Sequence, residues 1–272
     1  MNEGRTLPNH MKQATSHTME PCSGQADFFV TIDFDGTINE SDVTDAVIKK
    51  FARPDWQEAE RLWEEGSIGS RECLSLQMAL IDAPLEHIVE YACTHPLDPA
   101  FRDFLELLRD ASIPFAIISD GFKPIINGIL AKAGFSGIPV HANDLLEGET
   151  GLRTIFPNTS SVCHSGTCKC KTADLLAGGL PIVHIGDGRS DFCISRMATH
   201  VFCRGKLTGY CVENEIRHSP FTDFQGVKND FETFLNGGTP LSPEQDADMG
   251  LSRSFGNQPQ GVTPSPGLMT PN

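Results

Sequence analysis

Short apolar runs that end in aspartate, serine or glycine recur along the chain, and stretches with helical spacing separate them. The runs are Phe28–Ile32, Phe115–Ile118, Pro181–Ile185 and His200–Cys203. Runs that are apolar on both faces suit strands buried within a parallel sheet. Helices are predicted at Ala100–Arg109, Lys123–Ala133, Thr172–Ala177 and Asp191–Met197. This βαβ series predicts an α/β fold with a doubly wound parallel sheet.

The segment 42–95 interrupts this alternation. Its apolar residues recur with helical spacing, and it is too long for a simple crossover between two strands. We therefore expect a small helical cap at 42–95 and an α/β core made of 27–41 and 96–236. A decorated crossover connection is the simpler alternative. Residues 1–26 and 237–272 are polar, and the second stretch is rich in Gly, Pro, Ser, Gln and Thr, so both are predicted to be disordered tails.

Two aspartates follow the first predicted strand, at the edge where ligands bind in doubly wound sheets. In Asp33-Phe34-Asp35-Gly36-Thr37, both carboxylates project from one side of an extended segment. Asp33 can attack phosphorus, and Asp35 can protonate the leaving oxygen and later deprotonate water. Thr37 offers a hydroxyl and an N–H to a phosphate. A solvated turn is the alternative, and a calcium loop is disfavoured because no further acidic ligands follow at the required spacing.

Ser119-Asp120-Gly121 follows the second predicted strand. A serine hydroxyl and adjoining backbone N–H groups at the start of a helix are suited to hold phosphate oxygens. We therefore predict phosphate contacts at these three residues. An ordinary helix cap is the alternative for the serine.

Lys171 precedes the predicted helix Thr172–Ala177. Its ammonium can neutralise phosphate charge and restrain the nucleophilic carboxylate, so it is predicted to be catalytic and to bind phosphate. Because an isolated lysine is usually a solvated side chain, this prediction depends on the other motifs.

The sequence Gly186-Asp187-Gly188-Arg189-Ser190-Asp191 follows the third predicted strand. Asp187 lies where a metal ligand at a strand end belongs, and Asp191 follows one helical turn later. A few hard oxygen ligands that leave room for water and phosphate favour Mg²⁺. We predict metal contacts at Asp33, Asp35, Asp187 and Asp191. A helix cap with a glycine turn is the alternative.

In this order, the four motifs resemble the haloacid dehalogenase superfamily over residues 27–236. The resemblance implies a Rossmann-like core of five parallel strands with a C1-type helical cap. It also implies a phosphoaspartyl intermediate, and Mg²⁺ held by Asp33, the Asp35 carbonyl and Asp187. Asp191 would support the waters of the metal or the lysine.

Other segments resemble one group within the phosphoserine-phosphatase-like branch, the 2-hydroxy-3-keto-5-methylthiopentenyl-1-phosphate phosphatases of methionine salvage. They are Phe51–Trp56, Cys163–Lys171 and His218–Phe224. The neighbouring groups act on phosphoserine, phosphoethanolamine or phosphocholine, and they stay as alternatives. Asp42 and Trp56 are candidates for substrate contact. The arginine expected to grip the carboxylate of phosphoserine has no clear match at Leu76–Ala79, although Arg61 or Arg71 could replace it.

A catalytically idle, ligand-binding member of the same fold is the non-enzyme alternative, but all four motifs are intact. Phosphoryl transfer to an acceptor other than water would use the same residues. The net charge of −15 argues against nucleic acid or an acidic membrane surface as a partner. The expected partner is instead a small-molecule phosphate ester.

Nine cysteines, an odd number at irregular spacing, do not indicate a disulfide framework. The first 26 residues contain no apolar signal-peptide core, so we expect a cytoplasmic protein with reduced thiols. Four possible soft ligands lie together at Cys163, His164, Cys168 and Cys170. They could bind zinc, or the thiols could pack within the loop.

Overall fold

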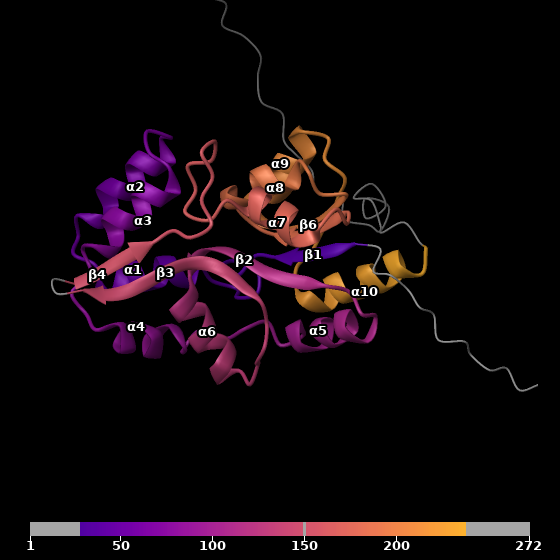
Figure 1. The fold of residues 1–272 in the computed structure, drawn as a ribbon, viewed down its shortest axis with the longest axis horizontal. Coiled ribbons are helices and arrows are strands. Elements are labelled where there is room, and N and C mark those ends of the chain that lie inside the picture. Colours follow the sequence, from indigo (N-terminus) through magenta and orange to yellow (C-terminus); the bar gives the residue numbers. More distant parts are fainter. Residues whose placement is uncertain (1–27, 149–150, 238–272) are drawn as a thin grey trace, which may run out of the picture.

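The computed structural model describes residues 28–148 and 151–237 (Figure 1). Apart from Gly237, the two predicted tails lie outside the described residues. Among the residues described, no helix is long and apolar enough to cross a bilayer.

A seven-stranded sheet runs through the middle of the described part, in the order β4-β3-β2-β1-β5-β6-β7. The strands are β1 Phe29–Ile32, β2 Phe115–Phe122, β3 Val140–Gly148, β4 Gly151–Ile155, β5 Ile182–Gly186, β6 His200–Cys203 and β7 His218–Pro220. Neighbouring strands pair in parallel, except that β4 pairs antiparallel with β3. The predicted α/β fold with a parallel sheet is confirmed.

The expectation of five strands is wrong, because the sheet extends further at both edges. β3 contains Asn143 and Asp144, residue types that are depleted in strands, so its sequence does not resemble one. Pairing with β2 and burial of Ala142 and Leu145 nevertheless favour the extended conformation. Tertiary contacts therefore outweigh local propensity in this strand.

Helices cover both faces of the sheet (Figure 1). One face packs against α5 Phe101–Asp110, α6 Lys123–Lys132 and α10 Phe224–Leu235, and the other lies under α7 Lys169–Ala177, α8 Phe192–Ser195 and α9 Gly205–Glu213. Side chains of β1 alternate between the two layers: Val30 and Ile32 join the cluster of the first face, and Phe29 joins that of the second. The central strand is thus buried on both faces, as its apolar sequence predicts.

Four helices occupy the connection between β1 and β2, which we call the cap segment (residues 42–95). They are α1 Val43–Phe51, α2 Trp56–Glu64, α3 Ser70–Met78 and α4 Leu85–Ala92. Val47 of α1 and Ile88 of α4 belong to the large hydrophobic cluster of the sheet. In contrast, α2 and α3 pack on each other, and α3 also packs against β4. The loop from β4 to α7 rises between the α2–α3 pair and α7 (Figure 1).

Candidate active site

Asp33 lies at the carboxyl end of β1, and its backbone N–H donates to Ile185 O of β5. Its side chain is buried, and Oδ1 accepts from the N–H of Phe34 at 2.8 Å. The Nζ of Lys169 is 2.7 Å from the same oxygen. Burial and the charge of Asp191 raise the pKa of Asp33, whereas Lys169 lowers it. The lysine therefore helps to keep this carboxylate ionised, as a nucleophile must be.

Asp35 is anchored by the start of α1. Its Oδ1 accepts from the N–H of Val43 at 3.0 Å, and its Oδ2 accepts from Thr44 Oγ1 at 2.7 Å. Burial and then the charge of Asp42 raise the pKa of Asp35 to about 7. A carboxyl group with this pKa can donate and accept a proton near neutral pH, as an acid–base catalyst must.

Two glycines allow the strand ends to approach the carboxylates closely. Gly36 has φ +69°, and a Cβ there would lie 2.4 Å from Oδ2 of Asp187. A Cβ on Gly121 would lie 2.7 Å from Oδ2 of Asp35. No larger residue fits at either position without moving a carboxylate, so both glycines are needed for this geometry.

Asp187 follows β5 and faces Asp33 across the strand ends. Thr37 donates from Oγ1 to Oδ1 of Asp187 at 3.3 Å, so the predicted phosphate contact of Thr37 competes with this hydrogen bond. Burial and the charge of Asp191 raise the pKa of Asp187 to about 6. The excess of negative charge at this edge of the sheet favours a bound cation.

Lys169, and not Lys171, reaches the carboxylates, so the prediction of Lys171 is wrong. The Lys169 side chain is fully buried, and its Nζ lies 2.7 Å from Asp33 Oδ1, 2.6 Å from Asp191 Oδ1 and 2.9 Å from Ser190 Oγ. Lys171 is exposed and donates to the carbonyl of Thr159 at 3.1 Å. Burial would lower the pKa of Lys169, but Asp191 and Asp33 raise it, so the ammonium stays charged.

The error arises because α7 begins three residues earlier than predicted, at Lys169. Residues two apart on a helix point in nearly opposite directions, so only one of the two lysines can face the site. Lys169 shares its buried face with Thr172, Ala173 and Ala177. This spacing is helical and is visible in the sequence, and it could have identified Lys169.

Asp191 is fully buried, and four hydrogen bonds occupy its oxygens. Oδ1 contacts Lys169 Nζ and, at 3.0 Å, His184 Nε2, whereas Oδ2 accepts from the N–H groups of Asp187 and Gly188. Burial alone would raise the pKa of Asp191, but Lys169 and His184 lower it. These contacts suit the support of the lysine and of the Asp187 loop better than direct coordination of a metal.

The sequence reasoning missed His184. Its ring lies inside β5, with Nε2 near Asp191 and Nδ1 2.9 Å from Thr31 Oγ1. A histidine within an otherwise apolar strand was the available signal. Its contacts indicate that it orients Asp191.

Asp33, Asp187 and Asp191 contribute carboxylate oxygens that all lie within 4.8 Å of one another. Among the described residues, no other group of three or more His, Cys, Asp or Glu side chains meets this criterion. Oxygen donors and surplus negative charge fit a hard divalent cation. Because the oxygens of Asp191 are already occupied, Asp33 and Asp187 are the carboxylates best placed to hold it.

The predicted zinc ligands do not form a compact group. The thiols of Cys168 and Cys170 are 3.4 Å apart, and Cys163 donates to Ser165 Oγ at 3.3 Å. His164 is exposed and lines a separate cavity. This arrangement agrees better with thiols that pack within the loop.

Ser119 and Gly121 lie beside Asp35 at the end of β2. The buried Ser119 Oγ accepts from the N–H of Gly121 at 3.0 Å, and both residues line the cavity that contains Asp33. The carboxylate of Asp120 instead contacts Ser70 Oγ at 2.5 Å and the N–H of Thr167 at 2.7 Å. The prediction that Asp120 binds phosphate is therefore wrong for its side chain, whose two anionic oxygens are held by the cap segment and the loop before α7.

The cavity above these carboxylates has a volume of about 580 Å³. The cap segment contributes Asp42, Trp56, Trp63 and Gln77 to its lining, so the two predicted substrate residues, Asp42 and Trp56, do face it. Gln77 is buried and donates to Glu60 Oε2 at 2.8 Å.

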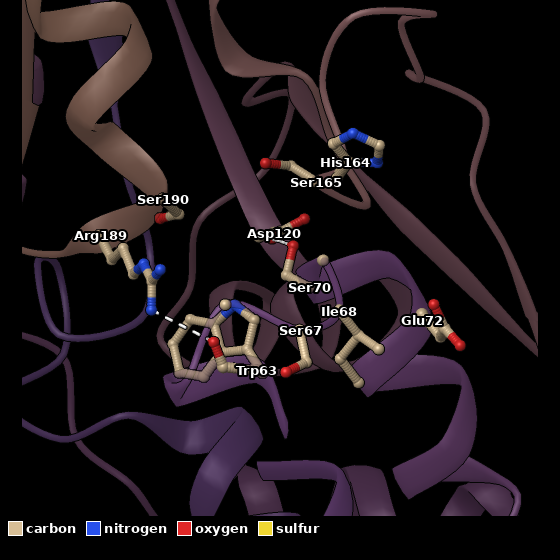
Figure 2. A pocket seen from close by; sticks show the side chains of 12 residues that line it. Trp63, Ser67, Ile68, Ser70, Glu72, Asp120, His164, Ser165, Arg189 and Ser190 are labelled. Atoms are coloured by element: carbon tan, nitrogen blue, oxygen red, sulfur yellow. Dashed lines mark hydrogen bonds between the residues drawn. The ribbon is translucent and has the colours of Figure 1, made fainter. Parts of the chain in front are cut away.

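A second cavity of about 500 Å³ adjoins the first (Figure 2). Trp63, Ser70, Asp120, Arg189 and Ser190 line both. The guanidinium of Arg189 lies 5.5 Å from the centre of the Trp63 ring and donates to the carbonyl of Trp63 at 3.2 Å. The sequence reasoning missed this contact between the motif after β5 and the end of α2.

Comparisons with known proteins agree with this geometry. The chain matches the family described as haloacid dehalogenase-like hydrolase over residues 30–196. It is 30% identical, over 209 residues, to a protein of Geobacillus thermodenitrificans named 2-hydroxy-3-keto-5-methylthiopentenyl-1-phosphate phosphatase, and the match covers 72% of this chain and 91% of that protein. A Brevibacillus brevis protein with the same name is 27% identical, with 72% of this chain and 90% of that protein covered.

Solved structures of phosphoserine phosphatase share the fold. A phospho-aspartyl intermediate analogue has a TM-score of 0.56 at 17% identity and covers 79% of this chain and 100% of its own. A substrate-bound complex has a TM-score of 0.59 at 16% identity and covers 78% of this chain and 99% of its own. At this level of identity the likeness concerns the fold alone.

Proposed function

Because the chain belongs to the haloacid dehalogenase-like hydrolases and is a phosphoric monoester hydrolase, we propose a specific reaction for it. The enzyme hydrolyses a small-molecule phosphate ester through a covalent phosphoaspartyl intermediate on Asp33 and uses Mg²⁺. The main support is the buried Lys169, whose ammonium contacts both Asp33 and Asp191 at the end of the central strand.

In the first step, an oxygen of Asp33 attacks phosphorus and the ester oxygen leaves. Lys169 stabilises the ionised carboxylate and the negative charge of the phosphoryl group. Asp35, with a pKa of about 7, donates a proton to the leaving oxygen. In the second step Asp35 removes a proton from water, which attacks the phosphoaspartate and releases phosphate.

The proposed metal site consists of the carboxylates of Asp33 and Asp187 and the backbone carbonyl of Asp35. When bound, the cation would neutralise charge on the phosphoryl oxygens. Asp191 holds Lys169 and the N–H groups of the loop 187–188, so it keeps the neighbouring groups in position.

We expect removal of divalent metal by a chelator to abolish activity, and added Mg²⁺ to restore it. Ca²⁺ should inhibit, because its larger and less directional coordination shell can engage both oxygens of Asp33 and misalign the attack. The measurement is phosphate release from 4-nitrophenyl phosphate by chelator-treated enzyme with each ion added back. Full activity in the metal-free enzyme would exclude the proposed role of Asp187.

The substrate we propose resembles that named for the bacterial relatives, a keto phosphate of the methionine-salvage type. Phosphoserine is less well supported, because neither candidate arginine is placed to bind its carboxylate. Arg61 pairs with Glu58 and Glu65 on an exposed face. Arg71 donates to the carbonyls of Cys163 and Ser165.

Small neutral or weakly polar phosphate esters should therefore be better substrates than phosphoserine. A buried carboxylate without a partner costs more than the roughly 1–3 kcal/mol by which one methylene changes specificity. The comparison is kcat/KM for phosphoserine against keto-alcohol and amino-alcohol phosphates of similar size. A hundredfold preference for phosphoserine would reverse this order. Including an acceptor alcohol in a parallel assay distinguishes hydrolysis from phosphoryl transfer.

A further inference from the structure

The start of α3 meets the loop 163–167 in a close contact (Figure 2). Ser70 is the first residue of this helix, and its Oγ donates to Oδ2 of Asp120 at 2.5 Å. The same hydroxyl accepts from the N–H of Gly166 at 3.3 Å. A single side chain of the cap segment therefore binds both the end of β2 and the loop that leads to Lys169.

Asp120 continues this network on the core side. Its Oδ1 accepts from the N–H of the buried Thr167 at 2.7 Å. Asn143 donates to the carbonyl of Asp120 at 2.6 Å and accepts from Thr167 Oγ1 at 3.0 Å. Thr167 lies two residues before Lys169, so these bonds fix the backbone just ahead of the catalytic ammonium.

Steric contacts show how closely the two parts approach. A Cβ on Gly69 would lie 2.3 Å from the carbonyl oxygen of His164, and one on Gly166 would lie 2.8 Å from Oδ1 of Asp120. Beside them, the backbone N–H of Arg71 donates to the same His164 carbonyl at 3.2 Å. The interface is thus formed by backbone against backbone, and side chains at the two glycines would separate its halves.

We propose that Ser70 and Asp120 form a latch that couples docking of α3 to the placement of Lys169. Asp120 is then a positioning residue: its carboxylate joins the cap segment to the lysine loop and does not touch the phosphate. Without the latch, the loop 163–167 loses its contacts with α3, and Lys169 is no longer held against Asp33. The proposal rests on the proposed function, because it assumes that Lys169 acts on the phosphoryl group.

The test compares Ser70→Ala, Asp120→Asn, their double variant and Gly69→Ala with a matched control. The control is Ser75→Ala, a serine on the same helix whose Oγ lies 3.1 Å from Thr154 Oγ1 and which lines neither cavity. We measure kcat and KM for Mg²⁺-supported hydrolysis of 4-nitrophenyl phosphate, and hydrogen exchange of the backbone amides at 163–169. Melting temperatures verify that each variant is folded.

We expect Ser70→Ala, Asp120→Asn and Gly69→Ala to lower kcat by about tenfold or more with KM changed less than about threefold, since the lost contact acts after phosphate binds. The double variant should lie within about threefold of Asp120→Asn, because both changes remove one bond. Exchange at 163–169 should accelerate by about tenfold or more. Ser75→Ala should match the unaltered enzyme in both measurements.

Kinetics and exchange in Ser70→Ala and Gly69→Ala that equal those of Ser75→Ala would overturn the latch. Multiplicative losses in the double variant would also overturn it, because the two residues would then act separately. If the unaltered enzyme releases no phosphate, the proposed function fails, but the exchange measurement still decides whether Ser70 and Gly69 hold the loop.

Discussion

Replacing Asp33 with asparagine is expected to lower kcat by roughly 10⁵–10⁶-fold, the scale seen when a covalent nucleophile is removed. The amide is a poor nucleophile, and it also weakens the proposed metal site. Lys169 would lose one of its two carboxylate partners, although Asp191 would still hold it 2.6 Å away. The measurement is phosphate release from 4-nitrophenyl phosphate at saturating Mg²⁺.

Asp35→Asn is the matched comparison, since Asp35 lies on the same strand end and is proposed to transfer protons only. Its expected loss is roughly 10²–10⁴-fold, the usual contribution of a general acid–base group. The covalent mechanism would be excluded if Asp33→Asn kept substantial activity. A trapped phosphoenzyme in Asp35→Asn that is missing from Asp33→Asn would identify the phosphorylated residue.

The second large effect is expected at Lys169. Replacing it with glutamine should lower kcat/KM by roughly 10³-fold or more, because a buried ammonium aimed at the reacting phosphoryl group is lost. The variant also leaves Asp33 and Asp191 as neighbouring buried carboxylates, and breaking a buried ion pair costs about 3–5 kcal/mol of folding stability. Circular dichroism and thermal unfolding, measured with Mg²⁺ present, show whether the loss of activity occurs in folded protein.

Lys171→Gln provides the control, because Lys171 is exposed and bonds only to the carbonyl of Thr159 in this structure. Its kcat/KM should stay within about twofold of the unaltered enzyme, as for surface substitutions in general. If Lys171→Gln were the inactive variant and Lys169→Gln the active one, the assignment of the buried lysine would be reversed.

The local pattern of the chain was sufficient for the α/β fold, for four strands of the sheet, and for the aspartates at the ends of β1 and β5. Buried parallel strands are almost wholly apolar, so a polar group directly after one is conspicuous. In parallel sheets these strand ends meet at one edge, which brings Asp33 and Asp187 together. Strands β3, β4 and β7 were missed, because their polar sequences become extended only through pairing with neighbours.

Other features depended on contacts between residues far apart in the chain. The lysine that faces the site is decided by where α7 begins, and the N–H of Cys168, just before its first residue, donates to the carbonyl of Asn158. A shift of two residues at this point turns a helical side chain to the opposite face. Local sequence places helix ends poorly, so the choice between Lys169 and Lys171 required the tertiary structure.

The same physical reason accounts for Asp120 and His184. The sequence predicted a polar group at the end of β2, but the direction of the Asp120 carboxylate follows from Ser70, 50 residues earlier, and from Thr167, 47 residues later. His184 gained its role only when Asp191 folded back onto β5. The backbone position of a residue follows largely from local pattern, whereas the partner of a buried polar side chain is chosen by whichever distant group can satisfy its hydrogen bonds.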